Sequence, residues 1–114
     1  MQRKDKVILE KILNAVEVGL KIFNDVSLEK FLKNDALKLA MGMSIIRVGD
    51  LIKILSAEFL VENSQVKWKS LSDFGDVIAC EYDTVNMNEV YATIKKDFPE
   101  LKIQIEKILA EEEV

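Results

Sequence analysis

The stretch that decides the fold is Lys6–Phe23, which reads KVILEKILNAVEVGLKIF. Residues spaced by three and four share one face of an α-helix. The large apolar residues of this stretch recur at those steps: Leu9, Leu13, Val16, Leu20 and Phe23. Most charged residues fall outside that face. The pattern predicts an amphipathic helix that begins near Asp5, ends near Asn24-Asp25 and packs its apolar face against other elements.

The same periodicity continues towards the C-terminus. Ser27 is a suitable N-cap for a short helical turn through Phe31-Leu32, and Asn34 or Asp35 can cap a second long helix. The apolar stripe of that helix is Leu37, Met41, Ser44, Val48, Leu51 and Leu55. Ser44 is its polar member. It is either a hydrogen-bonding or close-packing position between helices, or a polar lining beside a site.

Two further polar breaks divide the remaining sequence, the first at residues 62–65 and the second at Asp83-Thr84 and Asn86. After the polar segment 62–65, a third helix is predicted from Trp68, Leu71, Phe74 and Val77 or Ile78. Val90, Tyr91 and Ile94 predict a fourth helix that ends near Asp97. Pro99 fits the first turn of a last helix, where its missing N–H is tolerated.

The fold class predicted from these signals is all-α. The architecture is an antiparallel bundle of four main helices plus a short helix, in a single domain over residues 1–114. With 114 residues the chain is large enough for one apolar core. Four glycines, one proline and no Gly/Ser-rich linker agree with long helices and short connections.

Composition excludes several classes of function. The chain has no histidine and one cysteine, Cys80, so neither a zinc site nor an internal disulfide is expected. No motif for a cofactor and no ligand spacing for a metal are found. A net charge of −4 argues against a general nucleic-acid coat. No apolar run is long enough to span a bilayer, and a cytoplasmic location is expected.

Several landmarks, taken in order, resemble the HepT-like proteins of the HEPN superfamily. Val48-Gly49-Asp50 is similar to an Ile-Gly-Glu turn of that family, with Asp50 in the acidic place. Trp68 followed by Leu71 is similar to the family's entry to its motif helix. The remaining landmarks are the opening helix and the closing one: Lys6–Leu13, Asp97–Leu101 and Ile105–Leu109.

The family's motif is Arg-Asn-x-x-x-His-x-Tyr. Alignment from Trp68 places Gly75 at the Arg, Asp76 at the Asn, Cys80 at the His and Tyr82 at the Tyr. The resemblance implies a metal-independent ribonuclease that serves as the toxin of a toxin–antitoxin pair. It also implies a homodimer with the segment 75–82 near its two-fold axis. The implied partner is a small nucleotidyltransferase, which can attach adenylate to the motif tyrosine, here Tyr82.

Metal-free RNA cleavage needs a proton shuttle near neutral pH and a cation for the phosphate. Gly75 offers only a backbone N–H, and Cys80 is a poor general acid at neutral pH. The leading hypothesis is therefore a non-catalytic HepT-like protein that pairs with a nucleotidyltransferase. One alternative is a HepT-like toxin ribonuclease with altered catalytic residues that retains RNA binding. Another is a structural helical dimer module.

Individual residues also have simpler interpretations. For Cys80, a small, partly buried structural residue is favoured over a nucleophile, because no histidine can activate the thiol. Asp76, Glu81 and Asp83 are interpreted as a solvated acidic surface. Trp68, between Lys67 and Lys69, is predicted to anchor the core and not to stack on RNA. Tyr82 is either a modification site or a ring packed at a helix end.

Overall fold

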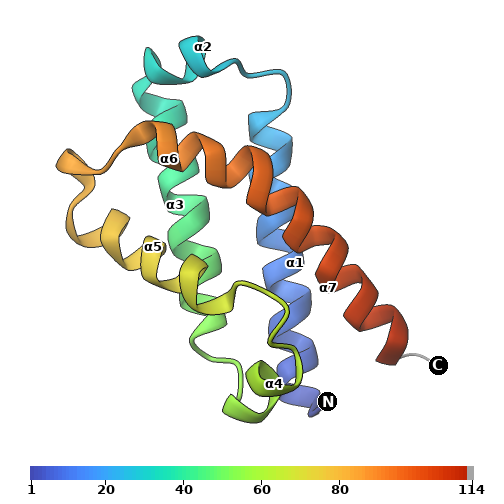
Figure 1. Cartoon of the computed structure of the whole chain (residues 1–114). Coiled ribbons are helices and arrows are strands. Elements are labelled where there is room, and N and C mark those ends of the chain that lie inside the picture. Colours follow the sequence, from blue (N-terminus) through green and yellow to red (C-terminus); the bar gives the residue numbers. More distant parts are fainter. Residues whose placement is uncertain (113–114) are drawn as a thin grey trace.

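The computed structural model describes residues 1–112 and is all-helical over that range (Figure 1), as predicted. Four main helices form the bundle: α1, α3, α5 and a continuous helix made of α6, η2 and α7. In chain order the elements are α1 (Arg3–Phe23), α2 (Leu28–Leu32), α3 (Asp35–Ile52), α4 (Ala57–Glu62), α5 (Trp68–Cys80), η1 (Tyr82–Thr84), α6 (Met87–Ala92), η2 (Thr93–Asp97) and α7 (Phe98–Glu112). Residues 113 and 114 of the predicted domain lie outside the described range.

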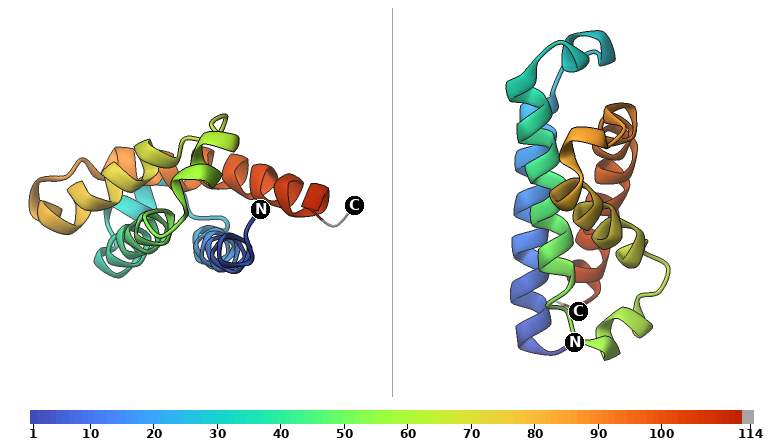
Figure 2. Two further views of the ribbon diagram at one scale, coloured as in Figure 1. Left: turned by 90° about the horizontal axis from the view of Figure 1, so that it is seen from below. Right: turned by 90° about the vertical axis from the view of Figure 1, so that its left-hand side faces the viewer.

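The main helices are arranged in two layers (Figure 2). Antiparallel α1 and α3 form one layer, and α5 together with α6–α7 forms the other. Each helix turns its apolar stripe towards the space between the layers. The side chains that meet there are excluded from solvent; they include Leu9, Ile12, Val16, Ile45, Val48, Ile78, Ile94, Phe98, Leu101 and Ile105.

Side-chain caps fix where the helices begin. The hydroxyl of Ser27 accepts a hydrogen bond from the Lys30 N–H, and the side chain of Asn34 accepts one from the Leu37 N–H. Both caps were predicted, and each satisfies a backbone donor that the first turn leaves free. The stripe predicted for the second long helix extended to Leu55, but α3 ends at Ile52. Leu55 is buried beyond that end.

The short helix α4 was not predicted, and a buried carboxylate holds it in place. Asp5 of α1 is 1% exposed and accepts hydrogen bonds from both the N–H and the hydroxyl of Ser56, at 2.9 and 2.7 Å. Ser56 in turn caps α4 by accepting from the Phe59 N–H. A buried carboxylate needs such partners. Asp5 therefore fastens the connection between α3 and α5 to the start of α1.

The prediction that the fourth helix ends near Asp97 and that a separate last helix follows is wrong. Helical backbone runs without interruption from α6 through η2 into α7, and η2 is a single π-helical segment. The Phe98 N–H bonds to the Thr93 carbonyl, five residues earlier. This wider turn leaves room before Pro99, whose ring would clash with the preceding turn of a regular α-helix. Phe98 packs closely on Gly19 and anchors the segment to α1.

Candidate functional site

The aligned motif falls on α5 and on the short 3₁₀ turn η1 that follows it. Trp68 anchors the start of α5: it is 4% exposed, and its indole N–H donates to the Asn63 carbonyl at 2.9 Å. This confirms the prediction of a core anchor. From there the helix presents one face to α3 and the other to solvent, so the motif residues are divided between two environments.

Gly75 lies on the buried face, directly against the backbone of α3. A Cβ atom at this position would lie 3.2 Å from the Ile45 carbonyl oxygen and 3.4 Å from the Ile46 Cα. Gly49 of α3 makes the reciprocal approach, with its Cβ position 3.3 Å from the Ser72 Cα. The two glycines let α3 and α5 cross closely, which accounts for a glycine inside α3 despite its low helix propensity.

Asp76 and Cys80 lie on the exposed face of α5. Lys53, just after α3, forms an ion pair with the Asp76 carboxylate and lies 3.8 Å from the Asp50 carboxylate. The hydrogen bond to Asp76 raises the pKa of Lys53 above its ordinary value of 10.5. Partial loss of solvent lowers it, whereas the charges of Asp76, Asp50 and Cys80 raise it further.

The structure therefore brings three of the sequence candidates together around Lys53: Asp50, Asp76 and Cys80. Lys53 itself was missed by the sequence analysis. Lys53 follows Asp50 by three residues, a spacing that indicates an ion pair on one face of a helix. The contact with Asp76, 23 residues further on, depends on the crossing of α3 and α5 and has no local signal. The free thiol of Cys80 is exposed, so the expectation that it is partly buried was wrong.

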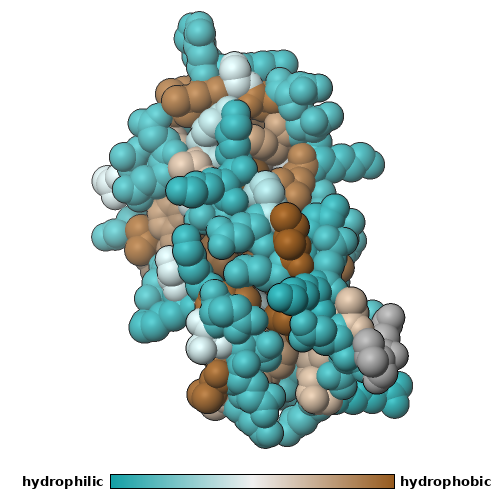
Figure 3. Space-filling view, turned by 45° about the vertical axis from the view of Figure 1, so that its right-hand side comes forward, coloured by the Kyte–Doolittle hydropathy of each residue, from teal (hydrophilic) through white to brown (hydrophobic). Residues whose placement is uncertain are grey.

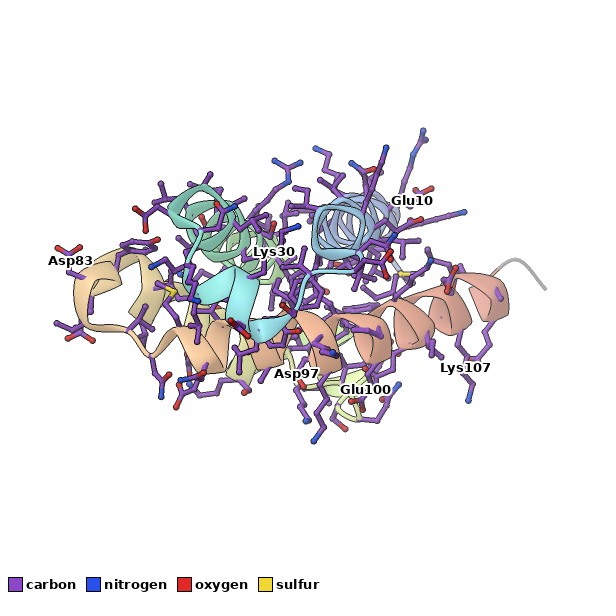
Figure 4. All side chains as sticks on the ribbon, turned by 90° about the horizontal axis from the view of Figure 1, so that it is seen from above. Glu10, Lys30, Asp83, Asp97, Glu100 and Lys107 are labelled. Atoms are coloured by element: carbon purple, nitrogen blue, oxygen red, sulfur yellow. The ribbon has the colours of Figure 1, made fainter. Side chains whose placement is uncertain are left out.

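Carboxylates outnumber ammonium groups around this surface. Asp73 pairs with Lys69 at 3.0 Å, and Glu81 and Asp83 are exposed just beyond the end of α5. Figure 4 shows Asp83 at the edge of the molecule, where η1 connects to α6. Asp76, Glu81 and Asp83, which were predicted to form a solvated acidic surface, are all exposed. Within residues 1–112, no group of three His, Cys, Asp or Glu side chains is placed to hold a metal ion.

Tyr82 lies apart from this cluster and is half-buried. Its ring packs on Gly42 of α3, where a Cβ atom would lie 3.5 Å from Cε1. The ring also lines a groove of about 440 Å³ together with Asp35, Lys38, Leu39, Asp83, Val85 and Met87. The hydroxyl makes no hydrogen bond to any residue in the range 1–112.

Ser44 lies on the α1 side of α3. Its hydroxyl donates to the Ala40 carbonyl at 3.0 Å, and its Cβ lies 3.5 Å from the position of a Cβ at Gly19. The residue therefore takes part in close packing between α1 and α3. The face of the molecule shown in Figure 3 is mostly hydrophilic, with separated apolar patches.

Comparison with known proteins agrees with this description. The chain is 35% identical over 104 residues to a "Putative RNase" from Caldanaerobacter subterraneus subsp. tengcongensis, covering 91% of this chain and 93% of the relative. It is 25% identical over 108 residues to a "Probable ribonuclease HepT" from Thermococcus cleftensis, covering 95% and 98%.

A third relative, from Methanocaldococcus jannaschii, is named "Gamma-glutamylcyclotransferase and putative RNase"; it is 31% identical over 110 residues, and the match covers half of its length. No solved structure matches the chain significantly. No helix within residues 1–112 is long and apolar enough to cross a membrane.

The sequence profile of the family described as "Ribonuclease HepT-like" matches residues 12–108. With this match over most of its length, and with the helical bundle described above, the chain belongs to the HepT-like ribonuclease family.

Proposed function

We propose that this chain is a HepT-like protein without self-sufficient ribonuclease activity, acting in the cytoplasm as the partner of a small nucleotidyltransferase in a toxin–antitoxin-type system. The observation that carries the proposal is the position of Gly75. At the place of the motif arginine, the structure has a glycine whose missing side chain makes room for the backbone of α3.

A catalytic arginine works by presenting its guanidinium to the phosphate. At position 75 the side chain would start 3.2 Å from the Ile45 carbonyl oxygen, inside the contact between α3 and α5. Backbone atoms in two packed helices cannot shift as a flexible side chain would. An arginine at position 75 therefore requires the backbones of α3 and α5 to move apart by at least a few tenths of an ångström.

The position of the motif histidine supports the same conclusion. Cys80 is exposed and has no histidine near it, since the chain contains none. Asp76, one helical turn before Cys80, and Glu81, directly after it, are both exposed, and their negative charge disfavours a phosphate backbone. The face that would hold RNA therefore lacks a proton shuttle suited to neutral pH.

Lys53 favours the second candidate, a ribonuclease with altered catalytic residues. Its ammonium group lies on the Cys80 side of α5 and is a cation that could replace the lost guanidinium. Both carboxylates near it, those of Asp50 and Asp76, already neutralise it. A phosphate would have to displace Asp76, so this candidate is less well supported.

The test of catalysis uses the purified full chain and a fluorophore–quencher RNA of mixed sequence. We expect cleavage no faster than in buffer, and no difference between the wild type and the variants Cys80→Ala, Lys53→Met and Tyr82→Phe. Cleavage that falls in the Lys53→Met or Cys80→Ala variant would overturn the proposal and support the altered ribonuclease.

The partner is tested by co-expression with the nucleotidyltransferase encoded beside this chain. We expect a complex that survives gel filtration and, in sedimentation, a homodimer of this chain. Mass spectrometry after incubation with ATP should show adenylate on Tyr82, and none on Tyr82→Phe. If no neighbouring gene encodes such an enzyme, or if neither a complex nor the modification forms, the partner part of the proposal is wrong.

A further inference from the structure

No other helix within residues 1–112 covers the outer face of the α1–α3 layer (Figures 2 and 4). An apolar groove runs along this face. Its volume is about 410 Å³, within the range of about 300–1,000 Å³ typical of binding sites. The groove is lined by residues of both helices: Asn14, Ala15, Val18, Ile22, Ala40, Met43, Ser44 and Arg47.

Large apolar side chains in this groove are open to solvent. Met43 is 61% exposed, Val18 47% and Ile22 40%. On α1, Val18 and Ile22 are one turn apart, and Met43 faces them from α3. Three aliphatic side chains gathered in one groove form a patch that water solvates poorly, and such patches are typical of interaction sites.

The groove is lined by one charged residue, and that residue is a cation although the whole chain is acidic. Arg47 is the charged residue of the lining, and among residues 1–112 its guanidinium forms no salt bridge. The carboxylates of α1 are engaged elsewhere. Asp5 bonds to Ser56, Glu17 lies 4.0 Å from Lys102 of α7, and Glu10 points to the side of α1 away from α3 (Figure 4).

The carboxylates of α3 are also directed away from the groove. Asp35 pairs with Lys38 at 3.3 Å, and Asp50 lies beside Lys53 on the α5 side. No carboxylate of α1 or α3 therefore lines the groove. Its chemistry is aliphatic with one cationic end, and it complements an apolar helix face that carries a carboxylate.

We propose that this groove binds an amphipathic helix of a different protein, with two or three aliphatic side chains over Val18, Ile22 and Met43 and an acidic residue against Arg47. Helices dock in grooves of this kind through apolar residues spaced i, i+3 or i+4, and i+7. A second copy bound by two-fold symmetry would bring two copies of Arg47 into one interface, and the groove lining supplies no carboxylate to pair with either. The charge pattern therefore favours a different partner.

This proposal goes beyond the proposed function, because it concerns the α1–α3 layer and holds whether or not the α5 surface cleaves RNA. The probe is a synthetic amphipathic peptide of about 18 residues, long enough for five helical turns. It carries leucines at the docking spacing and glutamates beside them. A matched peptide has lysine in place of each glutamate. Binding to the full chain is followed by fluorescence anisotropy of a dye on the peptide.

We expect the glutamate peptide to bind at least about tenfold more tightly than the lysine peptide. Arg47→Glu should reverse that preference, and Met43→Ser should weaken both peptides. The matched controls are Lys107→Glu, which makes the same charge change on α7 (Figure 4), and Ile103→Ser, at a residue 67% exposed on α7. Neither control should change binding.

Several outcomes would overturn the proposal. One is equal binding of the two peptides, or no binding of either. A second is an Arg47→Glu variant with unchanged preference. A third is a homodimer in sedimentation that Met43→Ser dissociates and Ile103→Ser does not, which would show that a second copy occupies the groove.

Discussion

The two faces of α5 divide one sequence motif between two physical environments. On the buried face, Gly75 and Ile78 are fixed by their contacts with α3. On the exposed face, Asp76 and Cys80 are open to solvent, and Asp76 also forms an ion pair with Lys53. Packing limits what the buried positions can be, whereas the exposed positions are open to change. In the alignment proposed from the sequence, the arginine position therefore falls in the contact between α3 and α5, and the histidine position falls on the surface.

The largest effect should come from placing the motif arginine back on the buried face. Gly75→Arg should lower the free energy of unfolding by more than about 3 kcal/mol or abolish folding, because overpacking alone costs about 1–3 kcal/mol and a buried, unpaired cation adds to it. Urea unfolding followed by circular dichroism measures this.

The matched control is Ala79→Arg, on the exposed side of the same helix. It should change stability by no more than about 0.5 kcal/mol. If Gly75→Arg were as stable as this control, the crossing of α3 and α5 would be more adaptable than its contacts indicate, and position 75 could carry a catalytic arginine.

The next largest difference in stability is expected between substitutions at two adjacent residues, Ile78 and Val77. Ile78 is fully buried, and Ile78→Ala should cost about 2–5 kcal/mol through lost packing and the cavity left behind. Val77 is 41% exposed, and Val77→Ala should cost less than about 1 kcal/mol. Equal losses in urea unfolding would contradict the assignment of the two faces.

The ion pair on the exposed face should have a smaller effect, visible in alkaline solution. Asp76 raises the pKa of Lys53 in the folded state, so the pair stabilises the fold below the unfolded pKa of 10.5. That contribution is lost as the pH rises through the higher folded pKa. Between about pH 9 and pH 12, the wild type should lose more stability than Lys53→Met.

The control for this pH series is Lys107→Met, which removes a lysine for which no salt bridge is found among residues 1–112. Its loss of stability on raising the pH should follow that of the wild type. If the stability of Lys53→Met also fell with pH as steeply as that of the wild type, the contact between Lys53 and Asp76 would not persist in solution.

The smallest effect is expected from restoring the motif histidine on the exposed face. Cys80→His should leave stability within about 0.5 kcal/mol of the wild type, because the position is open to solvent. It should also leave RNA cleavage at background, since position 75 still supplies no cation. Cleavage gained by Cys80→His alone, measured with the fluorophore–quencher RNA, would show that the arginine is dispensable on this scaffold.

Much of the fold could be predicted, because local signals specify it. The stripe of α1, the caps Ser27 and Asn34 and the anchor Trp68 each depend on residues a few positions apart. The failures have a common cause. Neither the buried Asp5 that holds α4 nor the π-helical turn that carries the chain through Pro99 is decided locally, because each depends on a helix distant in sequence.

The candidate site shows the same division. Alignment placed Gly75, Asp76, Cys80 and Tyr82 at the motif positions, but exposure could not be read from residue type: Cys80, expected to be partly buried, is on the surface. Lys53 was missed because its partner Asp76 lies 23 residues away.

By itself the sequence determined the all-helical fold, the long helices α1, α3 and α5 and the absence of histidine, because helical periodicity, caps and composition are properties of neighbouring residues or of the chain as a whole. Only the tertiary structure decided that Gly75 is closed in against α3, that Lys53 sits between two carboxylates and that the α1–α3 face is left open. These features depend on how helices far apart in sequence pack, and the approach of two backbones at Gly49 and Gly75 sets that packing.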